Sequence, residues 1–210
     1  MARSKRRAKI ISAARRLFYT KGYDNTTVRD ILDEAEVTNG AFFHHFESKQ
    51  ALMEAVIDVI ADELDSAVAL VMQDDSLTAI SRYQQLALAI NTFQETEGEV
   101  MSQIWLVAQG EHNLRLMHHL RRTVFESFVP KLAAILRQGI EEGVFDIEFV
   151  DEAAEMVLGI CELTMNGVFD VVSNPDHHDD PEKLISQKIQ IGQTAVDRLV
   201  GASLGKLLFV

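Results

Sequence analysis

The side chains best suited to specific molecular recognition lie between Thr26 and Phe46, where hydroxyl, amide, guanidinium, aromatic and imidazole groups are concentrated. Val28, Ile31 and Ala35 recur at helical spacing and predict a short helix, and a second short segment follows almost at once. Two short helices joined by a tight turn are typical of a helix-turn-helix, whose second helix lies in the DNA major groove. The chemistry indicated is therefore recognition of duplex DNA.

Two local features are expected to position these groups. Thr27 and Asp30 have the spacing of a capping box, which can start the first helix. Phe42 and Phe46 are four residues apart and can anchor a second helix that is too short to be stable alone. This anchoring leaves other sides of the helix for Asn39, Gly40, Phe43 and His44.

Composition predicts a soluble, all-α protein. The chain has 210 residues, of which 47% are hydrophobic and 25% charged. All three prolines lie from Pro130 onward, and alternating Val/Ile/Thr-rich runs are missing, so strands are not expected. The single cysteine, Cys161, excludes an intramolecular disulfide. Because we find no signal peptide and no apolar run near 18 residues, we expect a cytoplasmic protein without a membrane partner.

Charge divides the chain into two parts. Residues 1–50 contain ten Lys/Arg and six Asp/Glu, whereas residues 51–210 contain ten and twenty-six. A basic head can follow phosphates while an acidic body is repelled by them. The basic run from Arg3 to Lys9 is expected to form an arm that leads into a helix ending at Lys21-Gly22.

Three runs carry a resemblance to a known family. They are Ala14 to Tyr23, Thr26 to Ile31 and Gly40 to Leu52, and together they cover about a quarter of the chain. They resemble the N-terminal DNA-binding domain of the TetR family of bacterial transcriptional regulators. This resemblance implies a homodimeric regulator, usually a repressor, whose larger C-terminal helical domain binds a small molecule that lowers its affinity for DNA.

The resemblance also implies roles for single residues. Arg29 and Asn39 match positions that reach base edges, with Ala41 close to them, and an Asn side chain can pair with adenine through two hydrogen bonds. Phe43 stands where the family most often has tyrosine, so a hydroxyl that could reach the backbone is absent. The remaining residues of the expected DNA-binding surface comprise phosphate-contacting positions and their neighbours in the turn: Thr27, Thr38, Gly40, His44, His45 and Lys49.

The expected organisation is a three-helix DNA-binding domain at 1–47 joined to a ligand-binding and dimerisation domain at 48–210, with about nine helices in total. Ser48 is the expected N-cap of a long connecting helix. Five further helices are predicted at about 76–94, 99–110, 114–142, 149–172 and 181–205. No flexible linker separates the two parts, so a ligand signal is expected to travel as rigid-body motion.

A ligand cavity is expected among the helices of the larger domain, where bundles place such sites. Glu162 is the only charge in a run of fourteen residues, and Asn166 lies one turn further on the same face. Both are predicted to orient a small, largely hydrophobic guest. Apolar or basic side chains expected to line the cavity are Met101, Trp105, Met117, Leu120, Arg121 and Phe128. Core packing, solvent contact or a partner subunit are the alternatives for these residues.

The last two predicted helices are expected to form the homodimer interface. They carry Gly159, Gly167, Gly192 and Gly201 among apolar residues, and small residues allow helices to approach closely. Close packing within one chain is the alternative. A dimer is favoured because reading a palindromic operator requires a two-fold axis.

Metal binding, enzyme activity and an adaptor role are the alternatives to regulation through DNA. The adjacent histidines at 44–45 point about 100° apart on a helix, which disfavours chelation, and the segment Asp176 to Asp180 is explained by a polar loop and a helix start. No cofactor or metal is therefore expected. Motifs of nucleophilic, phosphate-binding or metalloprotease enzymes are missing, so an enzyme is not expected. The remaining alternative is a helical ligand-binding or adaptor protein with a vestigial DNA-binding head.

Overall fold

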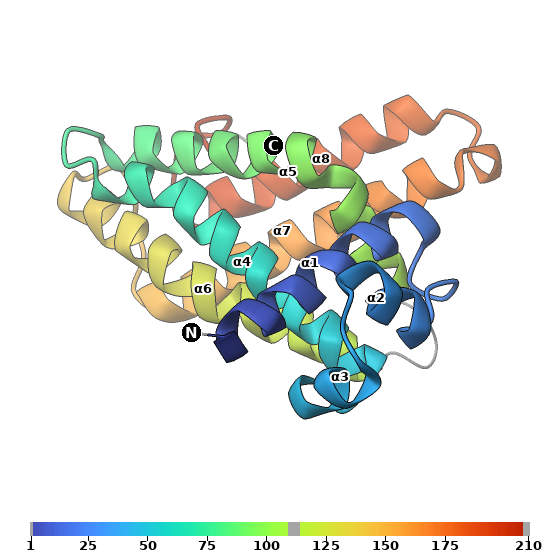
Figure 1. The fold of residues 1–210 in the computed structure, drawn as a ribbon. Helices are drawn as coiled ribbons and strands as arrows, with labels where there is room; N and C mark the ends of the chain where they lie inside the picture. Colours follow the sequence, from blue (N-terminus) through green and yellow to red (C-terminus); the bar gives the residue numbers. More distant parts are fainter. Residues whose placement is uncertain (1, 109–113, 208–210) are drawn as a thin grey trace. The chain divides into compact units, whose positions relative to one another are not determined.

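The computed structural model describes the backbone of residues 2–108 and 114–207, and the side chains of residues 5–93 and 114–207. Over this part of the chain the fold is all-α, with eight α-helices and one 3-10 turn (Figure 1). The expected fold class is confirmed. The elements are α1 (Ala2–Lys21), α2 (Val28–Ala35), α3 (Asn39–His45), α4 (Lys49–Gln73), α5 (Ala79–Ala108), α6 (Leu114–Glu141), α7 (Val150–Ser173), η1 (Pro175–His177) and α8 (Pro181–Leu199).

Three predicted boundaries are wrong. The last helix was predicted to run to about residue 205, but α8 ends at Leu199. A break was expected at Glu97-Gly98, but α5 continues through it, so the described residues form eight α-helices where about nine were expected. One glycine costs a helix interior only about 1 kcal/mol, which the surrounding helix-forming residues can offset. At the N-terminus, α1 already begins at Ala2, so the basic run forms the first turns of a helix and not a separate arm.

The chain forms two compact units. Unit 1 comprises Met1–Asp65 with Phe93–Val124, and unit 2 comprises Ser66–Thr92 with Phe125–Val210. Helices α4, α5 and α6 each contribute residues to both units. Unit 1 therefore includes more than the predicted DNA-binding domain at 1–47, and that boundary stays a prediction about function.

Unit 1 has a hydrophobic core around the three N-terminal helices. Phe42 is fully buried and Phe46 nearly so, which explains how the seven-residue α3 is held although so short a helix is unstable alone. Each fully buried large apolar side chain contributes about 1.5–3 kcal/mol. The same core contains Ile10, Ala14, Phe18, Ile31, Leu52, Val56, Leu116 and Leu120.

Unit 2 is closed by packing of α7 on α8 and by a buried carboxylate. At Gly192 of α8 there is no room for a Cβ atom beside Thr164 of α7, so the two helices approach closely there. Asp197 is fully buried and accepts hydrogen bonds from the backbone amides of Gly205 at 2.6 Å and Leu207 at 3.2 Å. These bonds stabilise a carboxylate that burial would otherwise penalise.

Helix α7 is apolar yet largely uncovered within the described chain. It contains an 18-residue window apolar enough to cross a membrane by length and composition, of which 17% is buried, so our expectation of no such run was wrong. Met156 is 59% exposed and Leu163 is 74% exposed.

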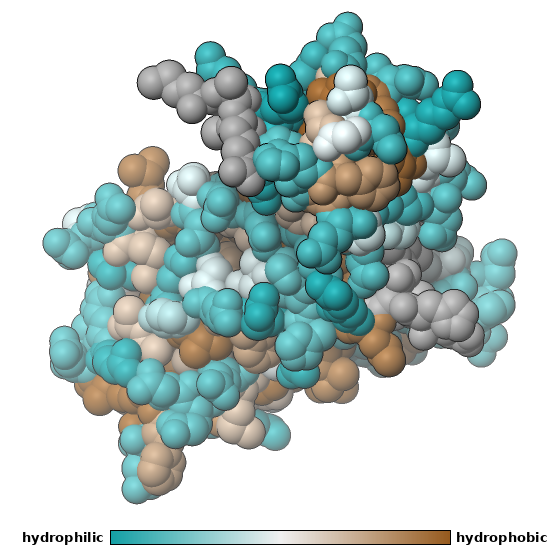
Figure 2. All heavy atoms as spheres, turned by 60° about the horizontal axis from the view of Figure 1, so that its bottom comes forward, coloured by the Kyte–Doolittle hydropathy of each residue, from teal (hydrophilic) through white to brown (hydrophobic). Residues whose placement is uncertain are grey.

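On the face shown in Figure 2, hydrophilic residues predominate and hydrophobic residues are exposed between them in separate patches.

Candidate DNA-binding site

Helix α2 begins with the predicted capping box. The Thr27 hydroxyl accepts a hydrogen bond from the Asp30 amide at 3.1 Å, and the Asp30 carboxylate accepts one from the Thr27 amide at 2.8 Å. The Thr27 hydroxyl also donates to Asp30 at 2.7 Å. These bonds, from the Thr27 amide first and its hydroxyl second, together with the Lys21 ammonium, lower the pKa of Asp30 to about 2. Any phosphate contact by this hydroxyl would have to share it with Asp30.

The turn between α2 and α3 contains one strained residue. Glu36 has φ 50°, a left-handed conformation, and its amide bonds to carbonyls at the end of α2. A residue with a Cβ atom pays about 1–2 kcal/mol for this conformation. Its carboxylate accepts a hydrogen bond from Lys9 of α1 at 2.7 Å.

Helix α3 presents its polar groups outward. Thr38 is the N-cap and accepts from the Ala41 amide at 3.3 Å. Asn39 and Gly40 are exposed in the first turn, and a Cβ atom added to Gly40 would meet open space. Since Phe42 anchors the opposite side, the first turn of α3 is accessible to a partner.

The other predicted contact residues vary in exposure. Arg29 and His44 are exposed, whereas Ala41 and His45 are half-buried. Phe43 is 53% exposed and packs edge-to-face on Phe42, with ring centroids 5.2 Å apart. A large exposed aromatic ring on a recognition helix can meet the methyl group of thymine.

Ion pairs between α1 and α2 explain how an acidic helix fits into a basic head. Lys21 pairs with Asp30 at 3.1 Å, Arg16 pairs with Glu34, and Lys9 pairs with Glu36. From pair to pair the residue numbers fall along α1 while they rise along α2 and the turn after it, as expected for two antiparallel helices. These three carboxylates are thereby paired with cations of α1, which reduces their repulsion of phosphates.

Lys49, at the first position of α4, makes contacts that the sequence did not reveal. Its ammonium donates to the carbonyl of Tyr23 at 2.8 Å and to that of Thr26 at 3.0 Å. It also lies 4.1 Å from the centroid of the Tyr23 ring. Burial lowers the pKa of Lys49, and the nearby Asp24 carboxylate opposes this shift.

Two residues with a structural part in the head were not singled out from the sequence. Tyr23 is buried and its ring packs against Phe18 at 5.1 Å. The Arg7 guanidinium lies 5.4 Å from the centroid of the Phe46 ring. The sequence did contain a signal for Arg7. If the first helix had been predicted to begin at Ala2, Arg7 would have fallen on the side of that helix that faces α3.

The predicted ligand-binding residues are divided between the units. Met101 and Trp105 have side chains outside the described residues. In unit 1, Leu120 is buried, Met117 half-buried and Arg121 exposed. In unit 2, Phe128 is buried, while Glu162 and Asn166 are half-buried. Their role as a ligand site stays a prediction.

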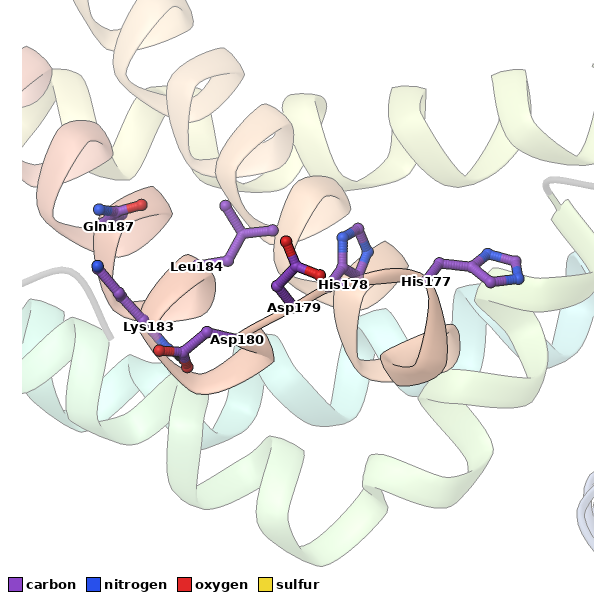
Figure 3. Close-up of a pocket in the computed structure, with 7 residues that line it drawn as sticks. All are labelled: His177, His178, Asp179, Asp180, Lys183, Leu184 and Gln187. Carbon is purple, nitrogen blue, oxygen red and sulfur yellow. Dashed lines mark hydrogen bonds between the residues drawn. The ribbon is translucent and has the colours of Figure 1, made fainter.

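A shallow pocket of about 390 Å³ lies elsewhere, at η1 and the start of α8. His178, Asp179 and Lys183 are among its lining residues, and the His177 ring points away from the other labelled side chains (Figure 3). Its lining mixes both signs of charge, and none of the predicted ligand-binding residues belongs to it. Where side chains are described, no three His, Cys, Asp or Glu residues are grouped to hold a metal.

Comparison with known proteins gives a consistent result. Residues 10–56 match the family "Bacterial regulatory proteins, tetR family". The transcriptional repressor DhaR of Mycobacterium sp. (strain GP1) is 27% identical over 143 residues, which are 68% of this chain and 71% of DhaR. Two regulators of Pseudomonas putida match over 49% of their own length.

Solved structures share the fold. RolR in complex with resorcinol has a TM-score of 0.66 at 20% identity and covers 98% of this chain and 92% of its own. FadR of Bacillus subtilis in complex with stearoyl-CoA has a TM-score of 0.65 at 18% identity, with coverage of 93% and 98%.

A capped helix-turn-helix on α2 and α3, in an all-α chain, defines a helix-turn-helix DNA-binding protein. Its DNA-binding region, residues 10–56, matches the TetR family of bacterial regulatory proteins. The relatives named above are transcription regulators, and this is the role that the similarity supports.

Proposed function

We propose that the protein is a cytoplasmic, ligand-responsive transcriptional repressor that binds a palindromic operator as a homodimer. The observation that carries this proposal is the outward first turn of α3, where Asn39 and Gly40 are exposed above a helix anchored by Phe42. A rigid, accessible helix N-terminus next to a compensated acidic helix suits insertion into the major groove.

Base reading is assigned to Arg29 and Asn39, with Ala41 and Phe43 offering apolar contacts. Thr27, Thr38, Gly40, His44 and His45 are assigned to the phosphates and the groove wall. Phosphate contacts position the protein without specifying the DNA sequence. Sequence specificity is therefore assigned to Arg29, Asn39, Ala41 and Phe43.

The homodimer is assigned to α7 and α8. Met156 and Leu163 on α7 and Ile191 on α8 are 59%, 74% and 71% exposed. Gly159 lies on the same side of α7 as Met156 and Leu163, and a Cβ atom there would meet open space. Apolar exposure on this scale is typical of an interface, and a second copy gives the two-fold axis that a palindrome needs.

The inducer is assigned to the class of small, largely hydrophobic molecules, with Glu162 and Asn166 as polar anchors. RolR was solved with resorcinol and FadR with stearoyl-CoA, so aromatic and acyl compounds are sensible first probes. A half-buried carboxylate in an apolar helix favours a guest that bears a hydrogen-bond donor or a positive charge.

The test is binding to DNA from upstream of its own gene, measured by fluorescence anisotropy against scrambled DNA of equal length. We expect sequence-selective binding with half-site centres about 34–36 Å apart or somewhat more, weakened steeply by salt. Resorcinol and stearoyl-CoA are then added to the complex. Equal affinity for every fragment would favour the adaptor with a vestigial head, for which the missing hydroxyl at Phe43 is the motivating feature.

A further inference from the structure

The α1–α2 turn, residues 22–27, is held from two directions. From one side, the buried Thr26 hydroxyl lies 2.7 Å from the carbonyl of Gly22 within the turn and 3.3 Å from that of Leu17 in α1, and it can donate to both, which ties the turn to α1. From the other side, the Lys49 ammonium donates to the carbonyls of Tyr23 and Thr26. The turn immediately precedes Thr27, the N-cap of α2.

Lys49 also marks the far end of the helix-turn-helix. Helix α3 ends at His45 with Phe46 as its C-cap, and α4 begins at Lys49 after Ser48, whose hydroxyl accepts from the Ala51 amide at 3.0 Å. Lys49 and Thr26 are 23 residues apart in sequence. One ammonium group therefore joins the turn before α2 to the start of α4, the helix that follows α3.

The energetic setting of this ammonium is unusual. A cation in the first turn of a helix faces the positive end of the helix dipole, which is unfavourable. Two carbonyl acceptors and the face of the Tyr23 ring at 4.1 Å offset that cost. Two of the three N–H donors of the ammonium are committed inside the protein, and the group is partly withdrawn from water.

We propose that Lys49 is a positioning residue that locks the two ends of the helix-turn-helix together and acts on DNA through the turn before Thr27, not through a phosphate. Without it, the N-terminus of α2 can shift against α4, and the groups on α2 and α3 no longer meet the duplex in one fixed geometry. This role of Lys49 in DNA affinity rests on the proposed DNA-binding function, whereas its role in holding the turn does not.

The first measurement needs no DNA. In Lys49→Met, which keeps the apolar stem and removes the ammonium, amide exchange of Thr26 and Thr27 in the free protein should accelerate about fivefold or more. The Ala41 amide, which bonds to Thr38 at the start of α3, is the internal reference. Unchanged exchange at Thr26 and Thr27 would overturn the proposal whether or not the protein binds an operator.

The second measurement separates positioning from phosphate contact. Affinity of Lys49→Met for the operator should fall about tenfold, because carbonyls that lose their donor release the turn. The slope of log affinity against log salt should stay that of the wild type. A phosphate contact would instead reduce the slope by about 0.9, with exchange unaffected, and this result would overturn the proposal.

Two further variants guard against simple unfolding. Lys49→Arg keeps a cation with several donors and should retain affinity within about threefold. Lys49→Gln keeps a shorter donor and replaces Lys49→Met if that variant does not fold. Loss of affinity in Lys49→Arg equal to that in Lys49→Met, at a temperature where both are folded, would contradict a role that depends on donating to the two carbonyls.

Discussion

The carboxylate of Glu36 accepts a hydrogen bond from the Lys9 ammonium at 2.7 Å, and the same Glu36 stands in a left-handed conformation with φ 50°. The contact ties the turn of the helix-turn-helix to α1. Both side chains are at least half exposed, so solvent screens the ion pair and it contributes little to stability. Backbone strain at Glu36 therefore outweighs the benefit of its side chain.

Replacing Glu36 by Gly should stabilise the protein by up to about 1 kcal/mol, because glycine adopts left-handed φ without the Cβ penalty. Urea unfolding monitored by circular dichroism measures the change. Glu36→Gln keeps the strain and loses only the charge, so it should change stability less than Glu36→Gly does. A destabilised Glu36→Gly protein would show that the Lys9 pair matters more than the strain.

Asp30 should make the fold sensitive to acid. Its pKa in the folded protein is about 2, below the ordinary value of 3.8, so its stabilising contribution is complete above about pH 4 and is lost as pH falls toward 2. Asp30→Asn should lower the melting temperature at pH 7, and the difference from the wild type should shrink below pH 4. Asp33→Asn on the same helix lacks the capping contacts and serves as the control. A difference that persists unchanged at pH 2 would contradict the linkage.

Asn39 should read one base pair in each half-site. Asn39→Ala should relax the preference at that position by about 1–3 kcal/mol, because a bidentate amide contact to adenine is lost. Binding to operators substituted one position at a time measures this effect. Asn39→Asp keeps the shape but removes the donors, and it should lose the same preference. If either change weakens every sequence equally, Asn39 contacts no base.

Leu163 should lie in the dimer interface. Leu163→Glu places a charge on the exposed apolar face of α7, and burying it unpaired against a second copy is costly, so the protein should become monomeric in analytical ultracentrifugation. Leu88 of α5 is similarly exposed, at 63%, and Leu88→Glu is the matched control that should remain dimeric. A dimeric Leu163→Glu protein would move the interface away from α7.

Glu162 should orient the inducer. Glu162→Gln should raise the concentration of inducer needed for operator release, while dimerisation and operator affinity stay the same, because a charged hydrogen bond to the guest becomes a neutral one. Release of labelled operator measures the effect. Glu155→Gln, on the same helix but exposed, should leave the inducer response unchanged. If Glu162→Gln instead breaks the dimer, Glu162 belongs to the interface.

The sequence alone was sufficient for features that depend on neighbouring residues. The capping box at Thr27 and Asp30, the N-cap at Ser48 and the end of α1 at Lys21-Gly22 were all predicted and are present. Phe42 and Phe46 were predicted as anchors and are buried. Each is set by spacing within one or two helical turns, where local hydrogen bonding and periodicity decide the outcome.

Contacts between residues far apart in the sequence were decided only by the tertiary structure. The bond from Lys49 to Thr26, the Lys9–Glu36 pair and the close approach of Gly192 to Thr164 depend on how whole helices pack, and no local pattern encodes them. Propensity differences of about 1 kcal/mol are small beside the burial of several apolar side chains, so packing determines how the helices are arranged and which side chains of a helix-turn-helix are left to meet DNA.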